Sequence, residues 1–169
     1  DVCSSDLDNP DACQPESARN EVISFLEGEV RDLSISRSTF SWGIPVPWDT
    51  KQVVYVWFDA LLNYATAVGL GDESDSAGGK KFSNTWPADV HLVGKDILRF
   101  HAVIWPAMLM AAGLPIPKKV FAHGWLLVGG EKMSKSKFTG IAPSDITNHF
   151  GVDAFRYYFR SEEHTSELQ

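Results

Sequence analysis

The sequence has few cysteines and no long hydrophobic run, and each shortage excludes a class of protein. Its two cysteines, Cys3 and Cys13, cannot form a disulfide framework, which favours a reducing, cytoplasmic setting. The longest apolar segment, residues 102–114, contains Pro106 and falls short of the ~20 residues that span a membrane. No basic start followed by an apolar core indicates a secretory signal. We therefore expect no membrane partner.

The sequence also lacks an excess of positive charge. It has 15 Lys and Arg against 22 Asp and Glu, a net charge of -7, which excludes a generally basic nucleic-acid-binding surface but leaves room for a local basic patch. What is present suits a globular protein, because 44% of the 169 residues are hydrophobic and 12% are aromatic. This length allows one domain of ordinary size.

Opposite strands of one DNA string can encode the two ends of the chain. The string GACGTGTGCTCTTCCGATCT encodes residues 1–6 and two bases of the next codon, and its reverse complement encodes residues 160–165 in the same way. Such a match is typical of a sequencing adapter translated at both edges of a read, and such segments do not enter fold reasoning. We predict that residues 1–7 and 160–169 are artificial and that the rest is the middle of a longer gene product.

Apolar strands alternate with helices along the middle of the chain. The residue pattern predicts strands at 53–58, 90–93 and 120–122, and helices at 59–68 and 95–112. This alternation predicts an α/β fold with a parallel sheet covered by helices on both faces. Ligands of such folds bind beyond the carboxyl ends of the strands. The other elements that we expect are a strand at 33–35, a hairpin at 125–133, helices at 17–28, 143–150 and 152–159, and loops at 8–16, 42–48 and 71–81.

The segment Glu-Lys-Met-Ser-Lys-Ser-Lys, residues 131–137, has three lysines and two serines close together after a double glycine. Ammonium groups and hydroxyls suit a polyphosphate whose charge grows in a transition state. From residue chemistry alone, a solvated basic loop is the simpler interpretation. The order Lys-Met-Ser-Lys-Ser, however, matches the second signature of class I aminoacyl-tRNA synthetases without a mismatch.

A second segment, residues 93–105, joins a predicted strand to the following helix. Gly94 lets the backbone approach a ligand at the strand end, and Asp96 begins the helix as either a cap or a ligand contact. Ile97, His101 and Trp105 recur every four residues and share one helical face. A histidine on such a face is more often a core residue than a ligand contact, so core packing is the alternative here.

A third segment contains Trp57 at the end of a predicted strand, with Ala60 and Tyr64 one helical turn apart. Together with His101 and Trp105, these residues would form an aromatic box with a polar corner. Such a box suits a thioether, because sulfur packs well against aromatic rings and accepts weak hydrogen bonds. Core packing is again the alternative.

A fourth segment contains His123 directly after the strand at 120–122, where a base contact and a structural role are equally consistent with the sequence. The four segments, in this order, resemble the methionyl-tRNA synthetase family over residues 15–159. The resemblance implies half of a Rossmann-type catalytic domain that activates methionine with ATP and Mg and transfers it to tRNA(Met). Residues 8–30 would end a connective insertion, residues 31–150 would form the C-terminal half of the catalytic domain, and residues 151–159 would begin the connection to a helical anticodon-binding domain.

The resemblance also implies which residues contact the substrates. Lys132 and Lys135 would be catalytic, because they would stabilise charge on the phosphates. Leu61 departs from the proline that the family often has at this position. The methionine pocket would comprise Trp57, Ala60, Leu61, Tyr64, Asp96, Ile97, His101 and Trp105. ATP would contact Gly94, Asp96, His123, Trp125, Leu126, Lys132, Met133, Ser134, Lys135 and Ser136.

Two features of the resembled family are missing. The first signature, His-Ile-Gly-His, does not occur, and only Cys13 remains between the artificial ends, so any zinc would bind in the missing insertion. We predict that the full-length protein is an enzyme, that this fragment is inactive, and that it holds no metal. Two alternatives stay open, a synthetase-derived binding module without adenylation activity and a class I synthetase for another aliphatic amino acid. The oligomeric state is unknown from the sequence.

Overall fold

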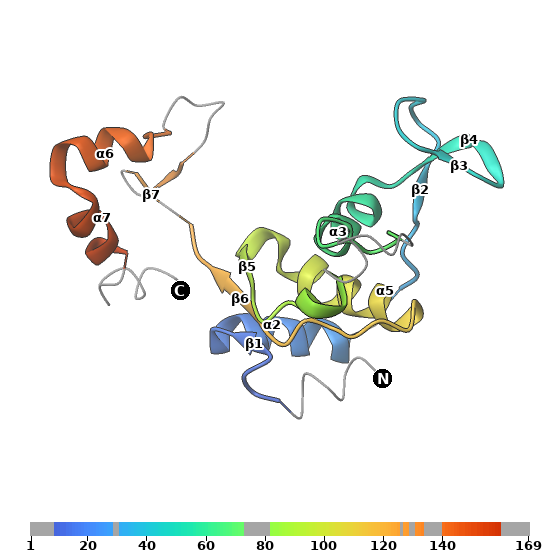
Figure 1. The fold of residues 1–169 in the computed structure, drawn as a ribbon, viewed down its shortest axis with the longest axis horizontal. Coiled ribbons are helices and arrows are strands. Elements are labelled where there is room, and N and C mark those ends of the chain that lie inside the picture. The colour runs from blue at the N-terminus through green and yellow to red at the C-terminus, as the bar shows by residue number, and fades with distance from the viewer. Residues whose placement is uncertain are drawn as a thin grey trace. The chain divides into compact units, whose positions relative to one another are not determined.

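The computed structural model describes residues 9–28, 31–72, 82–125, 127–128, 131–133 and 140–159 (Figure 1). The chain divides into two compact units, Asp1–His123 and Gly124–Gln169. The first unit contains a parallel sheet, a small antiparallel sheet and the helices that connect their strands. In the described part of the second unit there are a hairpin and two helices.

The first unit is organised around a three-stranded parallel sheet with strand order β1–β6–β5. β5 (His91–Gly94) pairs with β6 (Val120–His123) over its whole length, and β1 (Cys13–Gln14) pairs with the other side of β6. The predicted parallel α/β architecture is confirmed. The prediction of a loop at residues 8–16 is wrong at β1, because two paired residues are too few to produce a periodic pattern.

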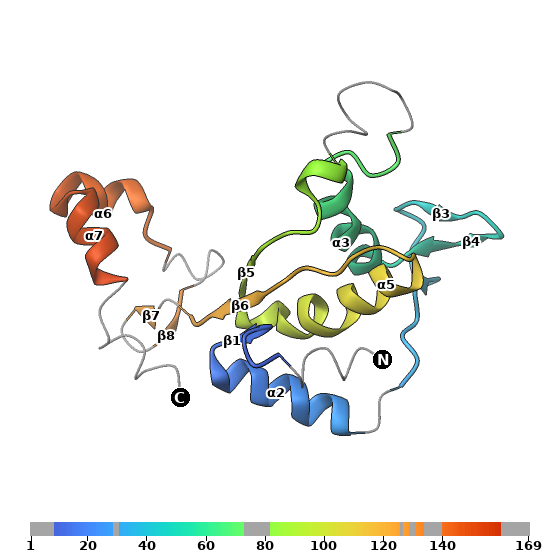
Figure 2. The same cartoon turned by 60° about the horizontal axis from the view of Figure 1, so that its bottom comes forward.

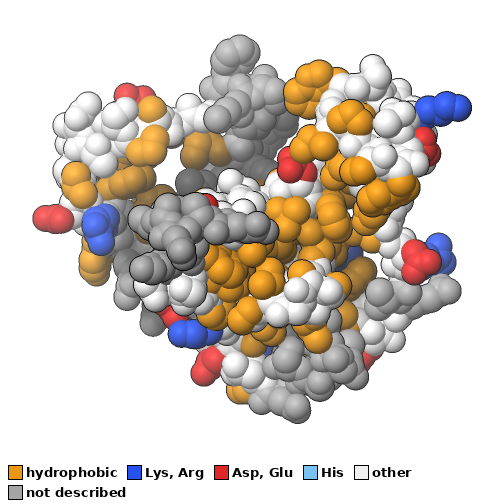
Figure 3. All heavy atoms as spheres, turned by 45° about the vertical axis from the view of Figure 1, so that its right-hand side comes forward, with side chains coloured by type: hydrophobic (Ala, Val, Ile, Leu, Met, Phe, Trp, Pro, Cys, Tyr) orange, Lys and Arg blue, Asp and Glu red, His pale blue; other side chains and the backbone are white. Residues whose placement is uncertain are grey.

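Helices cover one face of this sheet. Val93 of β5 and Val120 of β6 are buried on that face, where they share a hydrophobic core with Val22 of α2 (Glu16–Glu27). Figures 1 and 2 both show α2 beside β1. The opposite face leaves Leu92 69% and Phe121 38% exposed, so the expected cover on both faces is not found among the described residues. Figure 3 shows one view of the molecule in which hydrophobic side chains gather at the surface.

A second hydrophobic cluster lies between α3 (Val56–Thr66) and α5 (Trp105–Ala111). Its buried members are Leu61 and Ala65 of α3, Trp105 and Leu109 of α5, and Trp86. The Trp86 indole N–H donates to the Pro115 carbonyl at 2.8 Å, so its polar edge is satisfied within the cluster. Tyr64, which the sequence predicts for the methionine pocket, packs against this cluster.

The predicted strand at residues 53–58 is wrong from Tyr55 onward. β4 (Asp49–Val54) ends before Tyr55, and α3 begins at Val56, so Trp57 lies in the first turn of a helix. β4 pairs antiparallel with β2 (Ser36–Arg37) and β3 (Pro45–Val46), outside the parallel sheet. The loop expected at 42–48 is therefore wrong at β3, where two paired residues are too few to produce a periodic pattern. The strand expected at 33–35 therefore lies slightly later, at β2. The β-branched and aromatic residues at 56–58 favour a strand locally, but packing of the helical face of α3 overrides that preference.

The single long helix predicted at residues 95–112 is divided into three parts. A 3₁₀ turn, η1 (Lys95–Ile97), is followed by a π-helical segment, η2 (Phe100–Ile104), and then by α5. The Trp105 N–H donates to the Phe100 carbonyl, five residues earlier. Pro106 explains the interruption, because it has no N–H to donate and its ring disfavours the regular α-helical register of the preceding turn.

The second unit matches its predicted elements. β7 (Leu127–Val128) and β8 (Glu131–Lys132) form the expected antiparallel hairpin. α6 (Pro143–Phe150) and α7 (Val152–Tyr158) are separated by Gly151, whose φ of 83° lies in the left-handed region that favours glycine. The loop predicted at 71–81 lies, from residue 73 onward, outside the described residues.

Candidate active site

Tyr64 of α3 and His101 of η2 meet through a hydrogen bond. Tyr64 Oη lies 2.8 Å from His101 Nε2, and His101 Nδ1 lies 2.9 Å from the Ile97 carbonyl oxygen. Because a carbonyl only accepts, the neutral imidazole carries its proton on Nδ1 and accepts the Tyr64 hydroxyl at Nε2. His101 is 1% exposed, so this polar pair lies at the margin of the hydrophobic core. Two of the predicted methionine-pocket residues are thereby joined.

Leu61 and Trp105, also predicted for the methionine pocket, are core residues. Leu61 is 1% exposed and Trp105 is completely buried. The Trp105 ring packs edge-on against Trp86 at 5.9 Å and lies 6.4 Å from the Tyr64 ring. For Trp105 this burial is what the core-packing alternative predicts. Both residues belong to the hydrophobic cluster against which Tyr64 packs.

The remaining predicted pocket residues occupy different environments. Trp57 stacks on Phe100 with ring centroids 4.4 Å apart and an interplanar angle of 17°. Ala60 is exposed on α3, whereas Ile97 packs against the hydrophobic core of the parallel sheet. The sequence analysis missed Phe100, which the π-helical turn of η2 brings against Trp57 and which a regular helical pattern did not single out.

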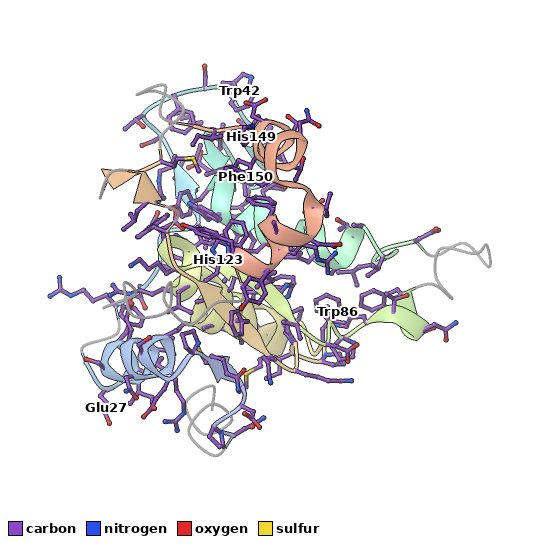
Figure 4. All side chains as sticks on the ribbon, turned by 90° about the vertical axis from the view of Figure 1, so that its left-hand side faces the viewer. Glu27, Trp42, Trp86, His123, His149 and Phe150 are labelled. Atoms are coloured by element: carbon purple, nitrogen blue, oxygen red, sulfur yellow. The ribbon has the colours of Figure 1, made fainter. Side chains whose placement is uncertain are left out.

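Gly94, Asp96 and His123 gather at the carboxyl end of the parallel sheet. Gly94 pairs with His123 in the β5–β6 register, and a Cβ at Gly94 would lie 2.7 Å from Asp96 Oδ1 and 3.8 Å from His123 Cε1. A side chain at Gly94 would therefore displace the Asp96 carboxylate. The topology brings these three predicted ATP contacts together; His123 is labelled in Figure 4.

Most of the lysine signature lies outside the described residues. Lys132 belongs to β8, and Met133 Sδ accepts a hydrogen bond from the Ile141 N–H at 3.3 Å. Trp125 is half-buried and is described within the second unit. The ATP contacts expected from this part of the chain stay predictions. The predicted residues outside the described part are Leu126, Ser134, Lys135 and Ser136.

His91 of β5 contacts three of the predicted pocket residues, and the sequence analysis did not single it out. Its side chain is 5% exposed, and its ring lies 4.4 Å from the Tyr64 ring and 5.8 Å from the His101 ring. The Trp105 indole N–H donates to His91 Nε2 at 3.3 Å. Its position in the sequence could have indicated that it is buried, because it lies two residues before Val93 and therefore on the same face of the predicted strand.

Burial keeps this group of side chains uncharged at neutral pH. It lowers the pKa of His91 to about 4, with repulsion from His101 as a second cause. It also lowers the pKa of His101, although the hydrogen bond to the Ile97 carbonyl opposes the shift. Burial raises the pKa of the Tyr64 hydroxyl. These side chains therefore form an uncharged group of packed rings whose hydrogen bonds have fixed directions.

The lowered pKa of His91 predicts a loss of stability in mild acid. The folded-state pKa of about 4 lies below the ~6.5 of an unfolded histidine, so the unfolded chain binds more protons between these values. The contribution of neutral His91 is fully present above pH ~6.5 and is lost as the pH falls toward 4, by on the order of 2–3 kcal/mol. Urea unfolding at several pH values measures this slope. The variant His91→Gln should have a shallower slope, and equal slopes in both proteins would contradict the assignment.

The described residues also bear on metal binding and on membrane insertion. They contain no group of three or more His, Cys, Asp or Glu side chains arranged to hold a metal ion. Within the same part of the chain, no helix is long and apolar enough to cross a membrane.

A parallel sheet with polar groups at its carboxyl edge, followed by a Lys-Met-Ser-Lys-Ser segment, is typical of class I aminoacyl-tRNA synthetases. The chain belongs to the family described as tRNA synthetases class I (M), whose model matches residues 5–168. It is 69% identical over 151 residues to the methionine–tRNA ligase of Streptomyces coelicolor and 58% identical over 155 residues to that of Caldanaerobacter subterraneus.

A solved structure gives the same family. Methionyl-tRNA synthetase of Mycobacterium tuberculosis, in complex with methionyl-adenylate, matches with a TM-score of 0.80 and 50% identity over 93% of this chain. The two ligase matches include 89% and 92% of this chain. The chain spans only 27% and 24% of the length of those two relatives, and 30% of the length of the protein in the solved structure. The family match reaches into both end segments, whose artificial origin stays a prediction.

Proposed function

We propose that the full-length protein containing this segment is a methionine–tRNA ligase. In this proposal, the methionine carboxylate attacks the α-phosphate of ATP, giving methionyl-adenylate and pyrophosphate, and the methionyl group then passes to the terminal ribose of tRNA(Met). The observation that carries the proposal is the Tyr64–His101 hydrogen bond within an aromatic enclosure. The identity to named methionine–tRNA ligases supports it.

The enclosure suits the methionine side chain better than a branched aliphatic one. A purely apolar pocket separates side chains that differ by one methylene by only about 1–3 kcal/mol. Methionine differs from leucine in shape and in its sulfur atom, so discrimination requires a shaped aromatic wall and a polar group. In this proposal, the rings of Trp57, Tyr64 and Trp105 form an aromatic wall that matches the shape of methionine. The Tyr64 hydroxyl and His101 are the polar groups that contact the sulfur.

The strand-end cluster would hold the charged parts of the substrates. Asp96 would bind the methionine ammonium group, while Gly94 and His123 would lie along the nucleoside of ATP, which binds as its Mg complex. Lys132 and Lys135 would stabilise the phosphate charge that develops during attack. We place the whole protein in the cytoplasm, and zinc would belong to the connective insertion upstream of this segment.

Methionine-dependent pyrophosphate exchange tests the proposal. The full-length protein should exchange labelled pyrophosphate into ATP with methionine and much less with leucine, because leucine lacks the sulfur that Tyr64 and His101 probe. The 169-residue chain alone should show no exchange, because the His-Ile-Gly-His signature is absent from it.

Other outcomes of this assay identify the alternatives. Exchange by the full-length protein that depends on leucine, isoleucine or valine would indicate a synthetase for another aliphatic amino acid. A full-length protein with no exchange for any amino acid would indicate a synthetase-derived binding module. Pyrophosphate exchange by the 169-residue chain alone would show that the His-Ile-Gly-His signature is not required for methionine activation.

A further inference from the structure

His91 is a buried titratable side chain to which the proposed mechanism assigns no task. It lies on β5, three residues before Gly94, and its backbone N–H donates to the Lys119 carbonyl at 2.8 Å. Strand pairing therefore fixes its backbone within the rigid parallel sheet. Its side chain leaves the sheet on the buried face, toward α3 and α5, where Tyr64 and Trp105 lie.

The contact with Trp105 requires a neutral imidazole of one tautomer. An indole N–H only donates, so His91 Nε2, at 3.3 Å from the indole nitrogen, must present its lone pair. The proton of the neutral ring is then on Nδ1. Trp105 is completely buried, so loss of the Nε2 acceptor leaves a buried donor unsatisfied.

His91 also contacts Tyr64, a residue of the predicted methionine pocket, so a fixed His91 ring also limits the position of the Tyr64 ring. The His91 and Tyr64 rings are 4.4 Å apart and inclined by 59°, and the far end of Tyr64 donates to His101 Nε2 at 2.8 Å. His91 thus touches both aromatic residues of the wall, one through a hydrogen bond and one through its ring. Trp86 touches Trp105 too, and its ring also stacks on Phe82, on the side of the core cluster.

We propose that His91 is a positioning residue for amino-acid recognition, which holds the Trp105 indole through Nε2 and the Tyr64 ring through its imidazole face. This inference rests on the proposed function, because it assigns the aromatic wall to the methionine pocket. Discrimination by shape depends on small displacements of that wall, whereas the nucleotide cluster at Gly94 and His123 lies at the other end of the strands. His91 therefore acts on methionine binding and not on ATP binding.

Two substitutions separate the functions of the imidazole. His91→Phe keeps a flat ring beside Tyr64 but removes the acceptor, whereas His91→Gln keeps an acceptor that reaches the Nε2 position. In the full-length protein, His91→Phe should raise the KM for methionine roughly ten-fold in pyrophosphate exchange and leave the KM for ATP within about two-fold. His91→Gln should recover most of the methionine affinity.

Trp86→Phe is the matched control. Trp86 packs against Trp105 and donates its indole N–H to the Pro115 carbonyl, a hydrogen bond that this substitution removes. The variant should therefore have a lower thermal stability, but its KM for methionine should be unchanged. In the 169-residue chain, the Trp105 indole N–H resonance should move in His91→Phe and return toward its original position in His91→Gln. This spectroscopic readout does not depend on activity.

The outcomes separate this inference from the proposed function. An unsubstituted full-length protein without methionine-dependent exchange would refute the proposed function, and the inference with it. Active protein in which His91→Phe leaves the methionine KM unchanged, or raises both KM values equally, would refute the role of His91 alone. A Trp86→Phe variant with the same rise in methionine KM would show that general loss of core packing explains the effect.

Discussion

Trp105→Ala should destabilise the 169-residue chain by about 3–5 kcal/mol, the cost of removing a large aromatic side chain from a packed core. Trp105 is completely buried, packs edge-on against Trp86 and donates its indole N–H to His91. Its removal creates a cavity between α3 and α5 and takes away a partner of His91. Because whole domains have only ~5–15 kcal/mol of stability, urea unfolding followed by circular dichroism should show a greatly lowered midpoint.

Trp48→Ala is the matched control for this substitution. Trp48 is 79% exposed, so the same change of side chain should alter the free energy of unfolding by no more than about 0.5 kcal/mol. If Trp105→Ala is unfolded without urea, Trp105→Phe gives the measurable value, since it keeps a ring in the cluster and removes the indole N–H. Equal unfolding midpoints for Trp105→Ala and Trp48→Ala would contradict the assignment of Trp105 to the core.

Lys135→Ala should reduce the rate of methionyl-adenylate formation by the full-length protein about 10²–10³-fold, equivalent to about 2.7–4 kcal/mol of transition-state stabilisation. Lys135 is the second lysine of the Lys-Met-Ser-Lys-Ser signature and lies outside the described residues. Its predicted role is electrostatic and is greatest when phosphate charge develops. The KM for methionine should therefore change little. Single-turnover adenylate formation separates the two effects.

Lys118→Ala is a control for charge removal alone. Lys118 forms an exposed ion pair with Asp89 at 2.6 Å, and exposed pairs of this kind contribute little. Its substitution removes one positive charge and should leave the adenylation rate unchanged. A Lys135→Ala variant that loses methionine affinity with an unchanged rate would contradict the assigned role and would indicate a binding contact instead.

The local residue pattern was sufficient to predict several helices and strands. The alternation of apolar strands with helices predicted the parallel sheet, and both β5 and β6 lie within a residue of their expected bounds. The double glycine predicted the β7–β8 hairpin, and Gly151 predicted the separation of α6 from α7. Gly94, Asp96 and His123 were predicted at one edge because parallel strands have their carboxyl ends together.

The sequence by itself therefore determined the fold class, the order of the elements and the segments from which the site is built, because these depend on residue periodicity and on short motifs. Only the tertiary structure decided that Trp57 begins a helix, that a π-helical turn brings Phe100 onto it, and that His91 lies between Trp105 and Tyr64. These contacts join residues that are distant in the chain, and one of them depends on the helix geometry before Pro106. No local pattern encodes such contacts, because packing between elements selects them.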